Sequence, residues 1–217
     1  MIPLTKTLHP NDFAQLEPEM RTVDQFFTAA REQHPMRRWE YAMALRAQAT
    51  WYDSTPVRPQ GPVIDVGGAG SPFWRMVNPE VCRVVDPEEG IDLAEYLRSG
   101  ARLASEVYCL SVLEHVDNLD QFLYHLNCLV APGGLLFLTM DHCGCDTHDA
   151  DMEVPTHVEQ HHFHWMRKRM FGRSDLREVA EHLLDLNLSW LGERDLTYLG
   201  NHVYDYTFAS LALVKRS

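Results

Sequence analysis

A glycine-rich turn that directly follows a short apolar run constrains this chain more than any other feature. The run Val63–Val66 predicts a buried parallel strand, and the glycines that begin at Gly67 predict a tight turn at its carboxyl end. Glycine adopts positive φ and lets the backbone approach a ligand closely. A second predicted strand, Cys82–Asp86, ends in a carboxylate 21 positions after Asp65, a spacing typical of an acid that binds ribose hydroxyls. Together these features predict a nucleoside-containing cofactor over the strand ends of an α/β sheet.

Two common glycine-rich loops do not fit this turn. The dinucleotide pattern G-x-G-x-x-G fails whether it is started at Gly67 or at Gly68, and the phosphate loop fails because no lysine follows. The first basic residue after the turn is Arg75, so the loop offers little to neutralise a pyrophosphate. Asp65 would repel a phosphate but would suit a cationic ligand. These residues therefore favour a cofactor that carries positive charge.

Four signals in one order resemble the class I S-adenosylmethionine (SAM) dependent methyltransferases, a Rossmann-like superfamily. The segment Asp65–Ser71 resembles the first motif, D/E-x-G-x-G-x-G, with alanine and serine in place of the second and third glycines. Asp86 falls where the family has its ribose-binding acid. The segments Val107–Val116 and Leu129–Thr139 resemble the fourth strand and the entry to the fifth. The resemblance covers about residues 60–141 and implies SAM as the cofactor.

The resemblance also assigns the parts of the cofactor to residues of this chain. The glycine turn and Asp65 would hold the methionine moiety, Asp86 the ribose, and Asp92 the adenine edge. The cofactor-binding residues that it implies are Asp65, Gly67, Gly68, Ala69, Gly70, Asp86, Pro87, Asp92, Leu110 and Ser111.

The predicted fold is α/β: a doubly wound, mostly parallel sheet of the seven-stranded type, with an antiparallel last strand and an N-terminal helical cap. We expect residues 1–60 to form the cap and residues 61–217 the SAM-binding domain, with 141–172 as a substrate-lid insertion, since loops of that length are usually functional. The cap prediction rests on helical periodicity around residue 23 and over Met36–Trp51.

Three local predictions accompany this fold. Only twenty residues separate Asp86 from Val107, so the third strand of the family is expected to be weak or missing. Helices are expected after the N-cap residues Asp117 and Ser174. Two closing strands, 195–199 and 207–214, are joined too briefly for a crossover helix and are therefore expected to pair antiparallel.

The composition excludes several classes of function. The net charge of −12 argues against a nucleic-acid-binding surface, because such surfaces depend on cationic contacts. No segment is long and apolar enough to predict a membrane span. Five cysteines at irregular spacing suit a reducing compartment better than a disulfide framework, which predicts a cytoplasmic protein. The oligomeric state is left open.

The catalytic residues are predicted from their place after the fourth and fifth strands. His115 is the first candidate for a general base and His142 the second. Alternatively, Glu114 and His115 have a structural role and support their own loop through hydrogen bonds. No metal is favoured, but Glu114, His115 and His161 are the ligands expected if a metal is used. Cys143 and the residues after it are interpreted as a lid rather than a zinc site.

Aromatic and basic residues of the cap are given structural roles. Trp39, Tyr41 and Trp51 are interpreted as core residues in preference to a pocket wall, and Arg37 with Arg38 as a solvated face.

The predicted function is SAM-dependent transfer of a methyl group to oxygen or nitrogen of a small-molecule acceptor (EC 2.1.1 class). Two alternatives stay open. One is a metal-assisted O-methyltransferase that acts on a sugar or RNA hydroxyl. The other is a non-catalytic subunit that binds SAM or a protein partner, which the altered glycines at 69 and 71 would permit.

Overall fold

The computed structural model describes residues 2–26, 35–77, 80–142, 171–197 and 207–216. The elements in chain order are β1 (Thr5–Thr7), α1 (Asp12–Gln15), α2 (Glu17–Asp24), α3 (Pro35–Ser54), β2 (Val63–Val66), α4 (Phe73–Val77), β3 (Cys82–Val85), η1 (Pro87–Glu89), α5 (Leu93–Arg98), β4 (Ala104–Leu110), η2 (Leu113–His115), α6 (Leu119–Leu129), β5 (Val130–His142), α8 (Arg173–Asp185), β6 (Leu188–Trp190), β7 (Arg194–Asp195) and β8 (Thr207–Lys215).

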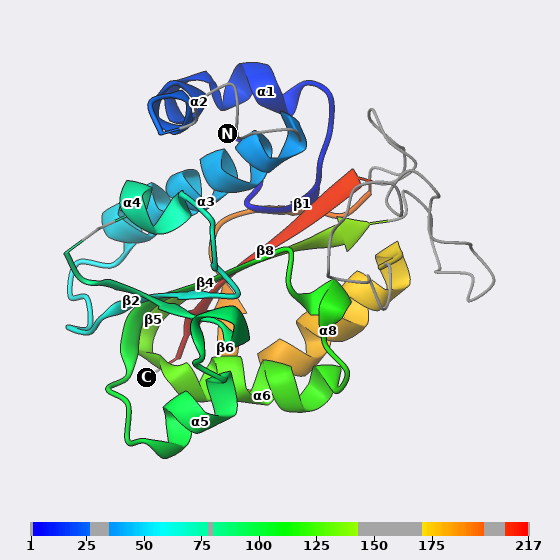
Figure 1. The fold of residues 1–217 in the computed structure, drawn as a ribbon. Helices are drawn as coiled ribbons and strands as arrows, with labels where there is room; N and C mark the ends of the chain where they lie inside the picture. The colour runs from blue at the N-terminus through cyan, green and yellow to red at the C-terminus, as the bar shows by residue number, and fades with distance from the viewer. Residues whose placement is uncertain (1, 27–34, 78–79, 143–170, 198–206, 217) are drawn as a thin grey trace.

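An eight-stranded sheet forms the centre of the molecule (Figure 1). Its order is β3-β2-β4-β5-β8-β1-β7, and β6 also pairs with β8. Strands β3, β2, β4 and β5 are parallel, whereas β8 runs antiparallel to β5, β6 and β1. The predicted α/β fold with a mostly parallel sheet and an antiparallel last strand is confirmed. Among the described residues the sheet has eight strands, one more than the seven-stranded type that was expected.

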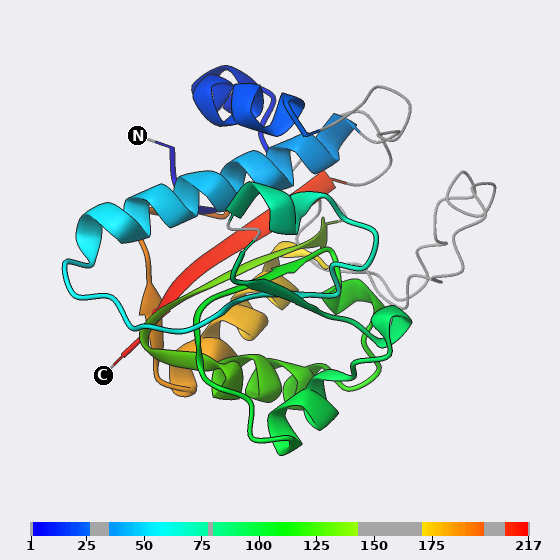
Figure 2. The same cartoon turned by 60° about the vertical axis from the view of Figure 1, so that its left-hand side comes forward.

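Helices cover both faces of the sheet, as Figures 1 and 2 show. Helices α1 to α4 lie on one face, and α5, α6 and α8 lie on the other. Side chains alternate along the strands, so that Tyr108 and Phe137 pack toward α3 while Val107 and Leu136 pack toward α6 and α8. The same alternation places Asp65 on the face that α3 covers. The arrangement is the doubly wound one that was predicted.

The N-terminal segment contributes a strand as well as the expected helices. Strand β1 is buried and pairs antiparallel with β8, with Lys6 opposite Ser210. Strand β7 pairs with β1 in parallel. The two closing strands run antiparallel, as predicted, but the expected direct pairing between them is wrong, because within the described ranges β1 lies between β7 and β8. The helix expected over Met36–Trp51 is confirmed as α3.

The helix caps differ by one or two residues from those predicted. Asn118, not Asp117, caps α6, because its side chain accepts a hydrogen bond from the backbone N–H of Gln121 (3.1 Å). Helix α8 begins one residue before Ser174, and its first turn is stabilised by Asp175, which accepts the N–H of Gly172 (2.6 Å). At the start of each helix, a side-chain oxygen accepts a hydrogen bond from a backbone N–H that has no acceptor within the helix.

The predicted loss of the third strand is confirmed. Between Asp86 and Val107, all of which the structure describes, the chain forms only η1, α5 and the start of β4. Strand β3 is consequently the edge of the sheet. The proposed lid begins inside a strand, because Asp141 and His142 are the last residues of β5, and 143–170 lie outside the described residues.

Candidate active site

The glycine turn follows β2 at the carboxyl edge of the sheet. Gly67 has φ +76° and Gly70 has φ +71°, a region that L side chains rarely adopt. The N–H of Gly67 donates to the carbonyl of Val85 (2.9 Å), and a Cβ at Gly67 would lie 2.3 Å from a methyl group of Val112. The turn therefore needs glycine at Gly67 for both conformation and space.

Ser71 stands where the family motif has its third glycine, and the structure gives the serine a role. Its Oγ accepts the backbone N–H of Phe73 (3.1 Å), which caps α4, and lies 3.1 Å from the hydroxyl of Tyr41 in α3. Serine at this position therefore connects the glycine turn to helices α3 and α4. Tyr41 itself is buried and stacks on Phe73, in agreement with the core role predicted for it.

Asp65 presents a buried carboxyl oxygen that has no protein partner among the described residues. The side chain is 2% exposed, and Oδ2 has no hydrogen-bond donor. Burial, together with the nearby Asp86 carboxylate, raises the pKa of Asp65 to about 7. A Cβ at Gly68 would lie 2.3 Å from the same oxygen, so only a residue without a side chain leaves room for this carboxylate next to the turn. A bound cation would compensate a group of this kind.

Asp86 joins the tip of β3 to the glycine turn. Its Oδ2 accepts the N–H of Ala69 (3.0 Å) and its Oδ1 accepts the N–H of Glu88 (2.8 Å). Pro87 follows as the first residue of η1. The structure thus brings Asp65, Asp86 and the turn together, as the sequence predicted.

The remaining predicted cofactor residues lie along the same edge. Leu110 ends β4, and Ser111 follows it with φ +52°. Asp92 is exposed and caps α5, where its Oδ1 accepts the N–H of Glu95 (3.1 Å). Its assignment to adenine stays a prediction.

A buried carboxylate that the sequence reasoning missed lies beside Ser111. Glu40 of α3 is fully buried, and its Oε1 accepts hydrogen bonds from the hydroxyls of Ser111 (2.5 Å) and Thr139. Its Oε2 pairs with a guanidinium nitrogen of Arg37 (3.1 Å). Burial raises the pKa of Glu40, while Arg37 and the two hydroxyls oppose that shift.

The side chain of Arg37 keeps 36% of its surface exposed, but its guanidinium also reaches the buried Glu40, a contact that the predicted solvated face did not include. The available signal was Glu40 itself, a glutamate between two buried aromatic residues, Trp39 and Tyr41, three positions after Arg37. Arg38 is half-buried and pairs with Asp24 on α2 (2.6 Å).

Glu114 is a second buried acid with an unpaired oxygen. The side chain is 1% exposed, and Oε2 has no partner among the described residues. Burial, followed by repulsion from Asp141, raises its pKa well above the usual range for a carboxyl group. His115 follows it as the half-buried last residue of η2.

His142 lies on the opposite face of β5 from Asp141. Burial lowers the pKa of His142 to about 4, so its imidazole is neutral at pH 7. His161 lies outside the described residues. Within the described ranges no cluster of three or more His, Cys, Asp or Glu side chains has the arrangement of a metal site.

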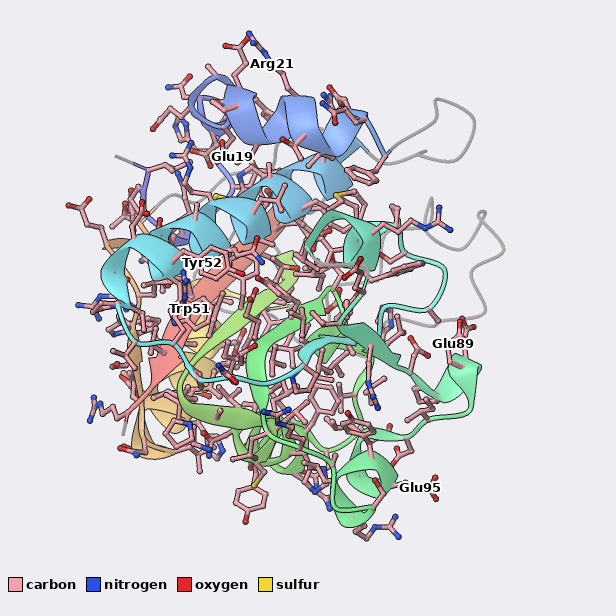
Figure 3. The ribbon with its side chains drawn as sticks, turned by 90° about the vertical axis from the view of Figure 1, so that its left-hand side faces the viewer. Glu19, Arg21, Trp51, Tyr52, Glu89 and Glu95 are labelled. Atoms are coloured by element: carbon pink, nitrogen blue, oxygen red, sulfur yellow. The ribbon has the colours of Figure 1, made fainter. Side chains whose placement is uncertain are left out.

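Two cavities lie at the amino-terminal edge of the sheet, away from the glycine turn. One, of about 500 Å³, lies beside the start of β3, and the other, of about 400 Å³, is lined in part by Trp51, Tyr52 and Glu106. Figure 3 shows Trp51 and Tyr52 on the side of the molecule away from Glu89, which follows the carboxyl end of β3.

The carboxylate in the second cavity is already satisfied. Glu106 accepts hydrogen bonds from Gln48 (2.7 Å) and Tyr52 (2.9 Å), which join α3 to β4, and from Tyr108 (2.6 Å) within β4. Asp65 and Glu114, at the carboxyl edge, each have an oxygen with no such donor among the described residues, so a ligand is needed there rather than in this cavity.

Comparison with known proteins gives a match in structure only. No family model and no curated protein matches the sequence. An S-adenosylmethionine-dependent methyltransferase from Clostridium acetobutylicum is 9% identical, with a TM-score of 0.50, over 95% of this chain and 99% of the other. Phosphoethanolamine N-methyltransferase 2 of Haemonchus contortus, solved with phosphomonomethylethanolamine and S-adenosylhomocysteine, is 12% identical, with a TM-score of 0.49, over 80% of this chain and 53% of its own.

The cyclase SpnF is 13% identical, with a TM-score of 0.47, over 95% of both chains. Against the Haemonchus enzyme, by contrast, this chain spans only about half of the other protein's length. Identities this low bear on the fold and not on activity. The sheet order, the antiparallel last strand and the likeness to the Clostridium enzyme give this chain the fold of the class I SAM-dependent methyltransferases.

Proposed function

We propose that this protein transfers a methyl group from SAM to an oxygen or nitrogen atom of a small-molecule acceptor. The observation that carries the proposal is the carboxyl group of Asp65, which is buried beneath the glycine turn and has one oxygen without a partner among the described residues. Leaving such a group without a partner costs free energy that a bound cation recovers. The ammonium group of SAM is a cation of the required kind.

The residues around Asp65 fit the rest of SAM and do not fit a pyrophosphate. Asp86 lies beside Asp65, and each of its carboxyl oxygens accepts one backbone N–H and can accept more, as ribose hydroxyls require. Two neighbouring carboxylates would repel the phosphates of a dinucleotide. When bound, SAM supplies a methyl group on a positively charged sulfur, which is an activated donor.

The protein's own task is then to position the acceptor and to accept its proton. His115 keeps its place as the first candidate base, because it is the last residue of η2, at the carboxyl edge of the sheet. His142 is neutral at pH 7, but a pKa of about 4 makes it a weak base. Both assignments are proposals.

The environment proposed for the protein is the reducing cytoplasm. Cys82, Cys109 and Cys128 carry free thiols, which supports that compartment. No helix in the described ranges has the length and hydropathy needed to cross a bilayer.

Titration calorimetry with SAM, S-adenosylhomocysteine and NAD tests the cofactor. We expect the first two to bind and NAD not to bind. Asp65→Asn should weaken SAM binding by at least about tenfold, because charge-assisted hydrogen bonds contribute about 1.5–3 kcal/mol. Asp120→Asn makes the same change on the exposed surface of α6 and serves as the matched control. Binding of NAD, or unchanged SAM affinity in Asp65→Asn, would refute the proposal.

A further inference from the structure

Ser111 has a backbone conformation that residues other than glycine rarely adopt. Its φ is +52°, and within the described ranges Asn187 is the one other non-glycine residue with a positive φ. A side chain costs free energy in this region, and asparagine tolerates it better than serine does. Such a conformation persists only where the surrounding structure holds it, and residues of this kind gather at functional sites. The contacts that hold Ser111 are therefore worth following.

Three hydrogen bonds hold Ser111 in place. Its backbone N–H donates to both the carbonyl and the hydroxyl oxygen of Thr139, each at 3.1 Å. Its hydroxyl donates to Oε1 of Glu40 (2.5 Å). Thr139 lies in the neighbouring strand β5, whereas Glu40 lies in α3, 71 positions earlier in the chain. The side chain of Ser111 is thus held by the N-terminal part of the protein.

Glu40 is itself held from several sides. The residue is fully buried, and its Oε1 also accepts a hydrogen bond from the hydroxyl of Thr139. Its Oε2 pairs with a guanidinium nitrogen of Arg37 (3.1 Å). Both carboxyl oxygens therefore have partners, and a buried polar network that is satisfied in this way is rigid. A carboxyl group with a fixed position can in turn fix the hydroxyl of Ser111.

The conformation of Ser111 determines where the next residue lies. The chain leaves β4 at Ser111, and Val112 then packs on the glycine turn, since a Cβ at Gly67 would lie 2.3 Å from its Cγ2. Strands β2 and β4 are neighbours, with Val66 opposite Cys109, so the turn and Ser111 follow adjacent strands. A change of φ at Ser111 would displace Val112 and with it one side of the proposed cofactor site.

The same helix also contacts the segment of the glycine turn. Tyr41 follows Glu40 in α3, and its hydroxyl lies 3.1 Å from Oγ of Ser71. Two consecutive residues of α3 therefore reach the two chain segments between which the cofactor is proposed to bind.

We infer that Glu40 is a positioning residue of the cofactor site, which holds Ser111 in its left-handed conformation and so keeps the end of β4 where cofactor binding requires it. This inference rests on the proposed function and extends it, because it makes α3 part of the site, whereas the helix was expected to belong to a cap outside the SAM-binding domain. Glu40 acts through Ser111 and needs no contact with the cofactor.

Two replacements of Ser111 test whether its backbone conformation matters for binding. Ser111→Ala and Ser111→Gly both remove the hydroxyl that Glu40 holds, but glycine adopts a positive φ about as readily as a negative one. Calorimetry with S-adenosylhomocysteine should therefore show at least about fivefold weaker binding by the alanine variant than by the glycine variant. Equal affinities of these two variants would overturn the inference.

A double-mutant cycle tests whether Glu40 is the residue that holds Ser111. Glu40→Met keeps the length of the side chain and removes its hydrogen bonds, so we expect about tenfold weaker binding of S-adenosylhomocysteine. Addition of Ser111→Gly should restore at least about threefold of this loss, because glycine needs no support at positive φ. Unchanged affinity in Glu40→Met, or a double variant that binds no better than Glu40→Met, would contradict the assigned role.

Tyr52→Phe is the matched control for the loss of a contact between α3 and β4. It removes the hydrogen bond from Tyr52 to Glu106, which joins the same helix to the same strand at the amino-terminal edge. Both Tyr52→Phe and Glu40→Met should lower the melting temperature, but Tyr52→Phe should leave S-adenosylhomocysteine affinity unchanged. An equal loss of affinity in Tyr52→Phe would show that any loosening of α3 disturbs the site, and would remove the specific role of Glu40.

The parent protein separates this inference from the proposed function. If the parent binds S-adenosylhomocysteine but the cycle shows no coupling between Glu40 and Ser111, the inference is overturned and the cofactor assignment stands. If the parent does not bind S-adenosylhomocysteine, the proposed function falls and the inference falls with it.

Discussion

Replacement of Asp65 by asparagine should make the stability of the protein less dependent on pH. In the unfolded chain an aspartate ionises near 3.8, whereas in the folded protein the pKa of Asp65 is about 7. Unfolding therefore releases a proton between these values, so the contribution of Asp65 to stability is complete below pH 3.8 and is lost as the pH rises through 7. Asparagine does not titrate and should escape this loss.

The size of the effect follows from the two pKa values. At about 1.36 kcal/mol per unit, the preferential ionisation of Asp65 in the unfolded chain lowers the unfolding free energy by about 2 kcal/mol at pH 5 and by about 4 kcal/mol at pH 8, relative to low pH. The difference in unfolding free energy between Asp65→Asn and the parent should thus shift by about 2–3 kcal/mol in favour of the variant between these pH values. Any constant cost of burying the amide cancels in this comparison.

Urea unfolding of both proteins at pH 5 and pH 8, without cofactor, measures this shift. Asp120→Asn, which alters an exposed carboxylate, should track the parent at both pH values. The same Asp65 variant should bind SAM more weakly, which is the trade-off expected where a binding site holds an unsatisfied charge. A difference that does not change with pH would show that Asp65 has a partner in the folded protein and would remove the argument for a bound cation.

Three further predictions concern the turn and the N-terminal segment. Asp86→Ala should weaken S-adenosylhomocysteine binding in calorimetry and lower the unfolding free energy by about 1–3 kcal/mol, because two backbone N–H groups lose their acceptor. Unchanged affinity would remove Asp86 from the site. Gly70→Ala should lower the unfolding free energy by about 1–2 kcal/mol, because residue 70 has a positive φ. Gly67→Ala should lower it clearly more, because its Cβ would also meet a neighbouring side chain, and equal melting temperatures of the two variants would contradict this. Lys6→Met should cost about 3–5 kcal/mol in urea unfolding by leaving the buried Asp12 carboxylate without its cation, and a loss below about 1 kcal/mol would show that the charge finds another partner.

The sequence was sufficient for the parallel half of the sheet and its turn. The run Val63–Val66, the glycines after it and the acid at Asp86 are local signals, because strand, turn and tip are contiguous in the chain. The missing third strand was predictable for the same reason, since the length available between Asp86 and Val107 is fixed by counting.

The remainder depends on contacts between distant segments, which a single sequence does not display. Strand β1 has three residues and gains its stability from pairing with β8, so it carries no periodic signal of its own. Glu40 bonds Ser111 and Thr139, residues 71 and 99 positions away, and nothing in the helix around it predicts those partners. The unpaired oxygens of Asp65 and Glu114 were likewise visible only once burial was known.

The pairing of β1 with β8 has a consequence for how the protein is made. The hydroxyl of Ser210 donates to the carbonyl of Leu4 (2.8 Å), a contact that joins residues 206 positions apart. During synthesis these first residues leave the ribosome long before their partner strand exists. The sheet can therefore close only after nearly all of the described chain has been translated, and contacts of such long range slow folding. Until then β1 lacks its partner strand, and its unpaired backbone groups are open to association with other chains.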